Sequence, residues 1–541
     1  MVGKNTLRIP NNRNSNAIYA NKSLFFSLFL TLITILSTIN QWTLSHNFIT
    51  YATISESLLK SPPSLYDSYW EIHPPFLFLL LAFWIWLFGN TLISFYALYA
   101  IVLLFFYLVI NLLVSKLHYK LNVLVFQVIL LSDFVLTNIF NMFFPIDIIG
   151  TLFCLTAILL LVIKCNLTNI TLAFTLSLLA IFTKEVFIFM PLALFVFLAI
   201  SKKIAIQRLL GAMAVSIVFV MSTIYLELKI SNSLEEYLQV TKYKKDIFSN
   251  NIFAKLVEQI QLAPYLYIKN FTVLGFNKNL SKLVLVFCSL LVVVMVIAMF
   301  KQSSRKSYID RIQNSKIALI YFGLISIMLG FLWQGKPLDD HYAIVVVPFV
   351  LIILYDGLNR IGFTTAPALK NRKIAKFFNV IVLLVLLIPN ANQIELSANR
   401  IINNLMDIRK NFGNMESESE LSSLTFKIPG CLQVAYGWGS ARYYHYSKID
   451  PCSKYFLAEL TVMSKDLSEN FRLDLLNNPP SAIYYNPLEA DLDVKIYEKN
   501  VFPYKNVISY CYAKDMDNQT LYRAKYLESS KMKDCLSLAV K

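Results

Sequence analysis

Leu24–Ile39 reads LFFSLFLTLITILSTI, a stretch of apolar residues with only serine and threonine among them. A strand in a soluble core uses about four to eight residues, so a run of this length favours a membrane-spanning helix. Comparable runs recur along the chain and together predict a polytopic α-helical membrane protein. They lie near residues 24–44, 75–89, 92–114, 121–140, 147–163, 170–182, 186–200, 205–226, 281–300, 317–333, 342–357 and 377–391.

Composition points the same way. The chain has 541 residues, of which 57% are hydrophobic and 15% are charged, and its mean hydropathy is +0.56. A soluble protein of this size needs more polar surface. The polar arm over residues 1–23 is too long for the first region of a signal peptide, and no small-residue cleavage site follows the apolar run. The first helix is therefore expected to be retained.

The net charge of +16 is unevenly distributed. From Asn392 onward there are 18 basic and 18 acidic residues, whereas 31 basic and 15 acidic residues precede it. Excess positive charge within the apolar part indicates membrane topology and anionic headgroups, and it argues against a nucleic-acid partner. The basic residues expected on the cytoplasmic side are Lys4, Arg8, Arg13, Lys22, Lys202, Lys203, Arg208, Lys301, Arg305, Lys306, Arg311, Lys316, Arg360, Lys370, Arg372, Lys373 and Lys376.

This charge pattern predicts three parts. They are a cytoplasmic arm over 1–23, a transmembrane domain over 24–391 with external loops 45–74 and 227–280, and an external soluble domain over 392–541. A cytoplasmic N-terminus and an external tail require an odd number of crossings. The short segment 75–89, between two external loops, is therefore expected to lie in the interface or to re-enter, unless a further segment exists. The prediction is about 11 to 13 transmembrane helices, with eleven preferred.

The tail over 392–541 has the pattern of a small α/β domain. Strands are expected at Leu432–Ala435, Ala482–Tyr485, Val507–Tyr512 and Thr520–Arg523, and helices at Phe456–Met463 and Leu467–Leu476.

Four of the seven cysteines lie in this tail, and an even number in an external domain is compatible with two disulfides of undetermined pairing. They are Cys431, Cys452, Cys511 and Cys535.

Ionisable residues gather at the predicted external ends of the helices. Each alone can be a solvated loop charge, and a helix start would suffice to explain Asp147. Lys184 and Glu185, however, stand between two apolar stretches with almost no loop to solvate them. The full set is Asp67, Glu71, His73, Asp147, Lys184, Glu185, Lys336, Asp339, Asp340 and His341.

Four short motifs follow one another in the order YDSYWEIHPPF from Tyr66, PIDIIGTLF around Asp147, LLAIFTKEVFIFMPL around Lys184, and GKPLDDHYAIVVVPFVL around His341. In their order over roughly residues 24–391, the chain resembles the GT-C membrane glycosyltransferases. This superfamily includes protein O-mannosyltransferases and bacterial aminoarabinose transferases. The layout of the tail is also similar to that of bacterial members. No single motif is specific, and their order and spacing carry the resemblance.

The resemblance implies transfer of a sugar from a polyprenyl-phosphate donor to a hydroxyl acceptor on a glycan, lipid or protein. The transfer would take place on the external face of an integral membrane protein, in a bacterial inner (plasma) membrane. The positions that match the family are Tyr66, Asp67, Glu71 and His73 in the first external loop, Asp147 in the second, Lys184 in the Thr-Lys-Glu turn, and His341–Tyr342 before a late helix.

Elementary chemistry suggests roles for these residues. A carboxylate or histidine must deprotonate the acceptor hydroxyl, and cations must hold the charge that grows on the departing phosphate. The candidate bases are Asp67, Glu71 and Asp147, the candidate phosphate-binding residues are Lys184, Lys336 and His341, and the candidate substrate-binding residues are Tyr66, His73, Glu185 and Tyr342.

One departure from the family pattern concerns the base. Family members usually carry an acidic residue just after the first helix, and here that place reads His46-Asn47-Phe48. Asn47 cannot accept a proton at neutral pH. Either the base lies elsewhere or the alignment is shifted by a few residues. Glu56, the nearest carboxylate downstream, stands in a helix-like stretch, and Asp67, Glu71 or even His46 could serve instead.

No cofactor is required by this chemistry and no tight metal-ligand spacing is visible, although acidic residues with His73 or His341 leave a divalent cation as an alternative. Trp84 and Trp86 in segment 75–89 suit either a wall for a polyprenyl tail or an aromatic belt.

Two other classes of function fit a polytopic membrane protein. A polytopic transporter or lipid flippase would place ionisable residues at helix midpoints and show internal symmetry. Asp133 is the main ionisable residue that lies within an apolar run. A catalytically lapsed GT-C-like scaffold would fit the missing acidic residue at Asn47.

Overall fold

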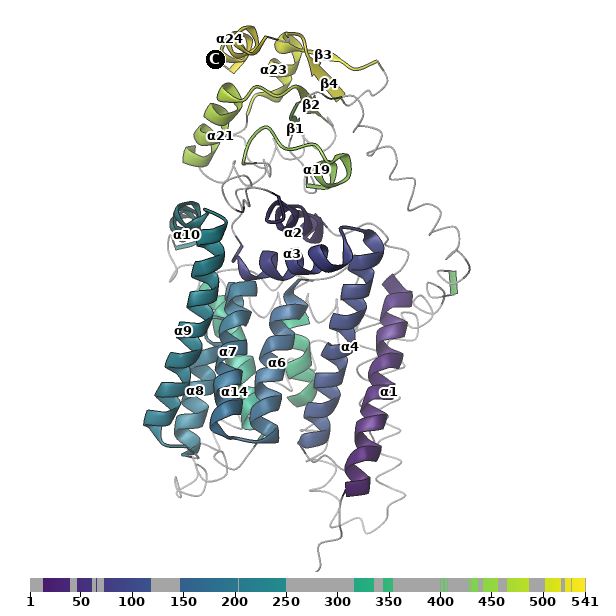
Figure 1. The fold of residues 1–541 in the computed structure, drawn as a ribbon, viewed down its shortest axis with the longest axis vertical. Coiled ribbons are helices and arrows are strands. Elements are labelled where there is room, and N and C mark those ends of the chain that lie inside the picture. Colours follow the sequence, from purple (N-terminus) through teal and green to yellow (C-terminus); the bar gives the residue numbers. More distant parts are fainter. Residues whose placement is uncertain are drawn as a thin grey trace, which may run out of the picture.

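The computed structural model in Figure 1 describes the backbone of most helices and of the C-terminal sheet. The described residues are 13–38, 46–60, 65, 73–117, 146–202, 204–249, 316–334, 344–353, 399, 402–403, 406, 428, 430–435, 441–455, 465–485, 502–516, 521–526 and 528–540.

A bundle of long apolar helices forms the lower part of Figure 1. Each predicted apolar segment within the described residues contains a helix, whereas the segments near 121–140, 281–300 and 377–391 lie outside them. The bundle consists of α1 (Arg13–Thr38), α4 (Leu92–Lys116), α6 (Asp147–Ile163), α7 (Leu167–Thr183), α8 (Met190–Ser201), α9 (Ile206–Ile230) and α14 (Ala318–Gln334), with a further helix at Ile344–Ile353.

Two of the described helices, Ile93–Lys116 and Ile206–Ile230, are long and apolar enough to cross a membrane by length and composition. α9 is apolar on both faces. Its inner face packs against α7 with Ala212, Val220 and Ile224 buried, while Val218 and Phe219 on its outer face are more than half exposed. An outward apolar face of this kind is unusual for a helix at the surface of a soluble protein.

Two shorter helices, α2 (His46–Ser57) and α3 (Phe76–Phe88), lie across one end of the bundle in Figure 1. α3 starts after Pro75 and ends at Gly89, whose φ of 79° is readily adopted only by glycine. Ile85 on one side of α3 is buried, whereas Phe83 on the other is 57% exposed and Trp86 is 68% exposed.

The C-terminal part lies beyond α2 and α3 and contains a four-stranded sheet of order β1-β2-β4-β3 (Figure 1). β1 pairs in parallel with β2, and the other two pairings are antiparallel. Cys431 bonds to Cys452 and Cys511 bonds to Cys535. The strands are β1 (Leu432–Val434), β2 (Ala482–Tyr484), β3 (Tyr512–Lys514) and β4 (Leu521–Ala524), and the helices are α19 (Ala441–Ser447), α21 (Lys465–Asn477), α23 (Tyr504–Cys511) and α24 (Ser529–Val540).

β1, β2, β4 and α21 lie within or around the runs predicted for them, whereas the strand predicted over Val507–Tyr512 is wrong. These residues form the second half of α23, and only Tyr512 belongs to a strand. Val507, Ile508 and Cys511 share one buried face with Tyr504. Their spacing is helical, and it outweighs the local preference of valine, isoleucine and tyrosine for strands. The helix predicted at Phe456–Met463 lies outside the described residues.

α19 of the C-terminal part packs directly on α2. Polar side chains bridge the two helices and their flanks, and one of them, His445, is buried. The bridging contacts are His445 Nδ1 to Thr53 Oγ1 at 3.3 Å, Lys448 Nζ to Glu56 Oε2 at 3.0 Å, and Lys60 Nζ to Asp450 Oδ1 at 2.7 Å.

Acidification is expected to weaken this contact through His445. Burial, and then the positive charge of Lys448, lowers the pKa of His445 to about 3, whereas an exposed histidine has a pKa of about 6.5. Between these values the unfolded chain binds a proton that the folded protein excludes. The free energy of unfolding should therefore be fully retained above the ordinary pKa and fall by about 1.4 kcal/mol for each pH unit below it.

Unfolding measured from about pH 8 down to about pH 5 tests this expectation. A His445→Gln variant keeps a polar group opposite Thr53 but cannot titrate, so its pH dependence should be shallower. Equal slopes for both proteins would contradict the assignment to His445.

Candidate functional site

A buried ion pair joins α6 to the end of α7. Lys184 Nζ lies 3.1 Å from Asp147 Oδ1, and both side chains are almost fully buried. α6 begins at Asp147, as the sequence predicts, but the carboxylate serves more than the helix start because it faces this lysine. A buried charge without a partner is costly, so each residue accounts for the burial of the other.

A break between α7 and α8 positions the lysine. α7 ends at Thr183, and Lys184 itself is extended, with φ −159° and ψ 133°. A short 3₁₀ turn, η1 (Glu185–Phe187), follows, and α8 restarts at Met190 with a proline in its first turn. Because the backbone leaves the helical path at Lys184, the Lys184 side chain can turn back toward α6.

Two glycines allow neighbouring helices to approach this break closely. A Cβ added at Gly150 of α6 would overlap the ring of Phe187 and the Thr183 hydroxyl. A Cβ added at Gly330 of α14 would overlap the carbonyl of Val186, with its carbonyl carbon only 2.7 Å away. The turn that carries Lys184 is therefore held between α6 and α14.

One oxygen of the Asp147 carboxylate has hydrogen-bonding capacity that the described residues leave unused. Asp147 Oδ1 is buried and accepts no hydrogen bond from any residue that the structure describes, although it lies at ion-pair distance from Lys184. An oxygen in this state can accept a hydrogen bond from a hydroxyl group, while the neighbouring ammonium can attract an anion.

Sequence reasoning missed Glu227 as a functional candidate and treated it as the start of the external loop 227–280. The structure extends α9 to Ile230, so Glu227 lies in its last turn with the side chain buried. Among the described residues, no group forms a hydrogen bond with either of its carboxylate oxygens. The signal in the sequence was an acidic residue within an otherwise apolar helix end.

Glu227 lies near Glu185 through Tyr237 of α10 (Leu234–Ser249). Burial, together with the negative charges of Glu185 and Glu227, raises the pKa of Tyr237 to about 12. Two acidic groups and a phenol therefore lie within electrostatic range of one another, and Glu185 directly follows Lys184 in the chain.

The other predicted site residues divide into two groups. His73 is half-buried, and its ring lies 5.1 Å from that of Tyr51 on α2. Glu56, the nearest carboxylate after Asn47, belongs to α2 and pairs with Lys448. Tyr66, Asp67, Glu71, Lys336, His341 and Tyr342 lie outside the described residues, as does Asp133.

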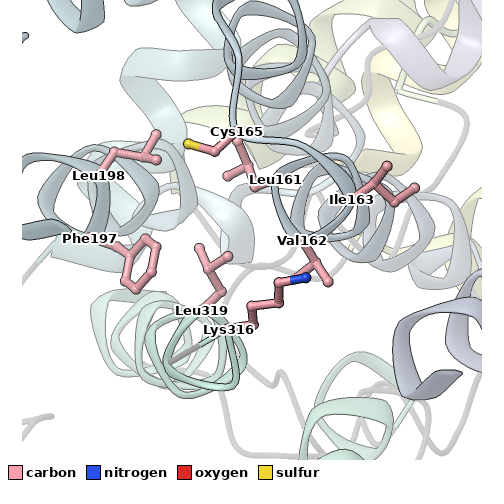
Figure 2. A pocket seen from close by; sticks show the side chains of 8 residues that line it. All are labelled: Leu161, Val162, Ile163, Cys165, Phe197, Leu198, Lys316 and Leu319. Carbon is pink, nitrogen blue, oxygen red and sulfur yellow. The ribbon is translucent and has the colours of Figure 1, made fainter. Parts of the chain in front are cut away.

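A small pocket, shown in Figure 2, lies at the opposite end of α6 from the ion pair. Leu161, Phe197 and Leu319 are among its apolar walls, and the Lys316 side chain extends toward Val162. Its lining contains no carboxylate, so it lacks a group that could act as a base.

Over the part of the chain that the structure describes, no three His, Cys, Asp or Glu side chains are grouped to hold a metal ion. Comparison with protein-family models finds no match, and comparison with curated proteins finds none either.

Proposed function

We propose that this chain is a membrane glycosyltransferase of the GT-C type. It takes a sugar from a polyprenyl-phosphate donor and passes it to a hydroxyl group of a glycan, lipid or protein. The observation that carries the proposal is the buried pair of Asp147 and Lys184, because two motifs of the family resemblance, far apart in sequence, meet in it.

The distribution of charge supports a membrane orientation with this pair on the external side. The end of the bundle away from α3 collects basic residues, as the cytoplasmic ends of membrane helices do. They are Lys116, Lys164, Lys202, Arg208 and Lys316, each in or next to a terminal turn. The C-terminal part, at the other end, contains two disulfides, which persist in oxidising compartments outside the cytoplasm.

The chemistry assigns a separate task to each group. As the bond between the sugar carbon and the phosphate oxygen breaks, Lys184 balances the charge on the leaving polyprenyl phosphate, and Asp147 holds the lysine in place. A new bond forms to the acceptor oxygen, and its proton passes to a carboxylate. Glu227 joins Asp67 and Glu71 as a candidate for this base. A divalent cation remains an alternative way to balance the phosphate charge.

The placement of charges supports an enzyme over a transporter or flippase. In α4, α6, α7, α8, α9 and α14, charged residues occur only in or next to the terminal turns. A transport pathway would place them near helix midpoints. The placement of charges does not distinguish an active enzyme from an inactive scaffold, so the activity assay must separate these two.

Transfer of labelled sugar from polyprenyl-phosphate donors in membranes that contain the protein tests the proposal. We expect label in an acceptor fraction, with release of polyprenyl phosphate. Matched membranes that lack the protein are the control. Absence of transfer across a panel of sugars and acceptors, with the protein folded, would favour the scaffold.

A further inference from the structure

The contact between α19 and α2 joins residues 392 positions apart in the chain. Its central ion pair links Lys448, directly after α19, to Glu56 in the last turn of α2. Glu56 Oε2 also accepts a hydrogen bond from Asn90 Nδ2 at 2.6 Å, in the turn between α3 and α4. One carboxylate thus connects the C-terminal part, α2 and the start of the bundle.

The backbone at Lys448 has a conformation that usually requires a glycine. Its φ is 54°, in the left-handed region, and its N–H bonds back to the Tyr444 carbonyl. Glycine is the residue that usually closes a helix in this way, because a Cβ makes the conformation costly. Lys448 adopts this backbone conformation despite its conformational free-energy cost, and its side chain pairs with Glu56.

From α2 the contacts continue to the candidate site. The Tyr51 ring stacks on Phe78 of α3 and lies against the ring of His73. α3 in turn contacts α7, the helix that ends beside Lys184. α2 is therefore packed between the C-terminal part and a residue predicted to bind substrate.

We propose that the C-terminal part positions the active site through α2. Lys448 and Glu56 hold α2, and α2 holds His73 and α3 against the bundle. The two charged residues are positioning residues, since neither lies beside Asp147 or Lys184. The effect on sugar transfer rests on the proposed function, whereas the mechanical effect on α2 and His73 does not.

Exchange of the two charges tests the inference in the full chain. We expect Glu56→Lys and Lys448→Glu each to raise hydrogen exchange in α2 and around His73 by about fivefold or more, and to lower sugar transfer to a similar extent. The double variant re-forms the ion pair in reverse, although not the hydrogen bond from Asn90, and should recover most of both losses. Recovery by the second charge change is not expected from two independent losses of stability.

Two substitutions at Lys448 provide matched controls. Lys448→Arg keeps the charge and should behave as the original protein. Lys448→Gly relieves the left-handed backbone but removes the pair, so thermal stability should be maintained while exchange in α2 rises.

Unchanged exchange in α2 in all variants would overturn the inference, as would raised exchange with undiminished transfer. Suppose that the original protein transfers no sugar, but hydrogen exchange around His73 rises in the single variants and recovers in the double variant. The proposed function then fails, and the positioning role of the contact is supported.

Discussion

Replacement of Lys184 by methionine is expected to destabilise the protein by about 3 to 5 kcal/mol, the usual result of leaving one buried charge without its partner. The Asp147 carboxylate lies 3.1 Å away and is almost inaccessible to water. It would have to remain charged without a cation or take up a proton. Thermal unfolding in detergent or nanodiscs measures the loss.

A double variant, Asp147→Leu with Lys184→Met, separates folding from chemistry. Removal of both charges leaves neither member of this pair as an unpaired ion, so much of the lost stability should return. Sugar transfer should not return, because the cation that we assign to the leaving phosphate is gone, and we expect a loss of about 100-fold or more.

Lys184→Arg serves as the control that retains a cation. If the double variant transfers sugar at the original rate, the assignment of the pair to the active site is wrong. If Lys184→Met loses no stability, the pair is not buried as the structure describes it.

Replacement of Gly330 by alanine should have the next largest effect. The new methyl group would overlap the carbonyl of Val186, a backbone group in the turn that carries Lys184. Overpacking against backbone costs about 1 to 3 kcal/mol, because the helix or the turn must shift. A shift of the turn would move Lys184 away from Asp147. We therefore expect sugar transfer to fall more than the amount of folded protein does.

Gly211 of α9 offers a matched control, because no heavy atom lies within 4 Å of a Cβ added there. Gly211→Ala should be neutral or stabilise by up to about 1 kcal/mol through helix propensity. Similar losses of stability and transfer in both variants would show that close approach at Gly330 is not the cause.

Much of the local structure could be predicted because helix and strand patterns repeat over a few residues. The apolar segments became helices where the structure describes them, α6 begins at Asp147, and β1 and β2 lie in the predicted runs. The failure at α23 is also local. Its residues favour strands individually, but their buried positions follow a helical spacing, and the helical spacing should have outweighed composition.

The candidate site was predictable only as a list of residues. The sequence predicts Asp147 as a candidate base and Lys184 as a phosphate ligand, but it does not predict the ion pair between them. Glu227 was placed in a loop because one further turn of α9 cannot be read from hydropathy. The contact of Glu56 with Lys448 depends on how a distant domain packs.

Apolar runs, the distribution of charge and the residues with suitable chemistry for a site can all be predicted from the order of the amino acids. The pairing of Asp147 with Lys184, the partners in the two disulfides, the burial of Glu227 and the packing of α19 on α2 appear only in the folded chain. The difference lies in the distance along the chain over which each effect acts. Periodicity and composition act between neighbours in the chain, whereas these contacts join residues whose distance in space depends on the packing of whole helices.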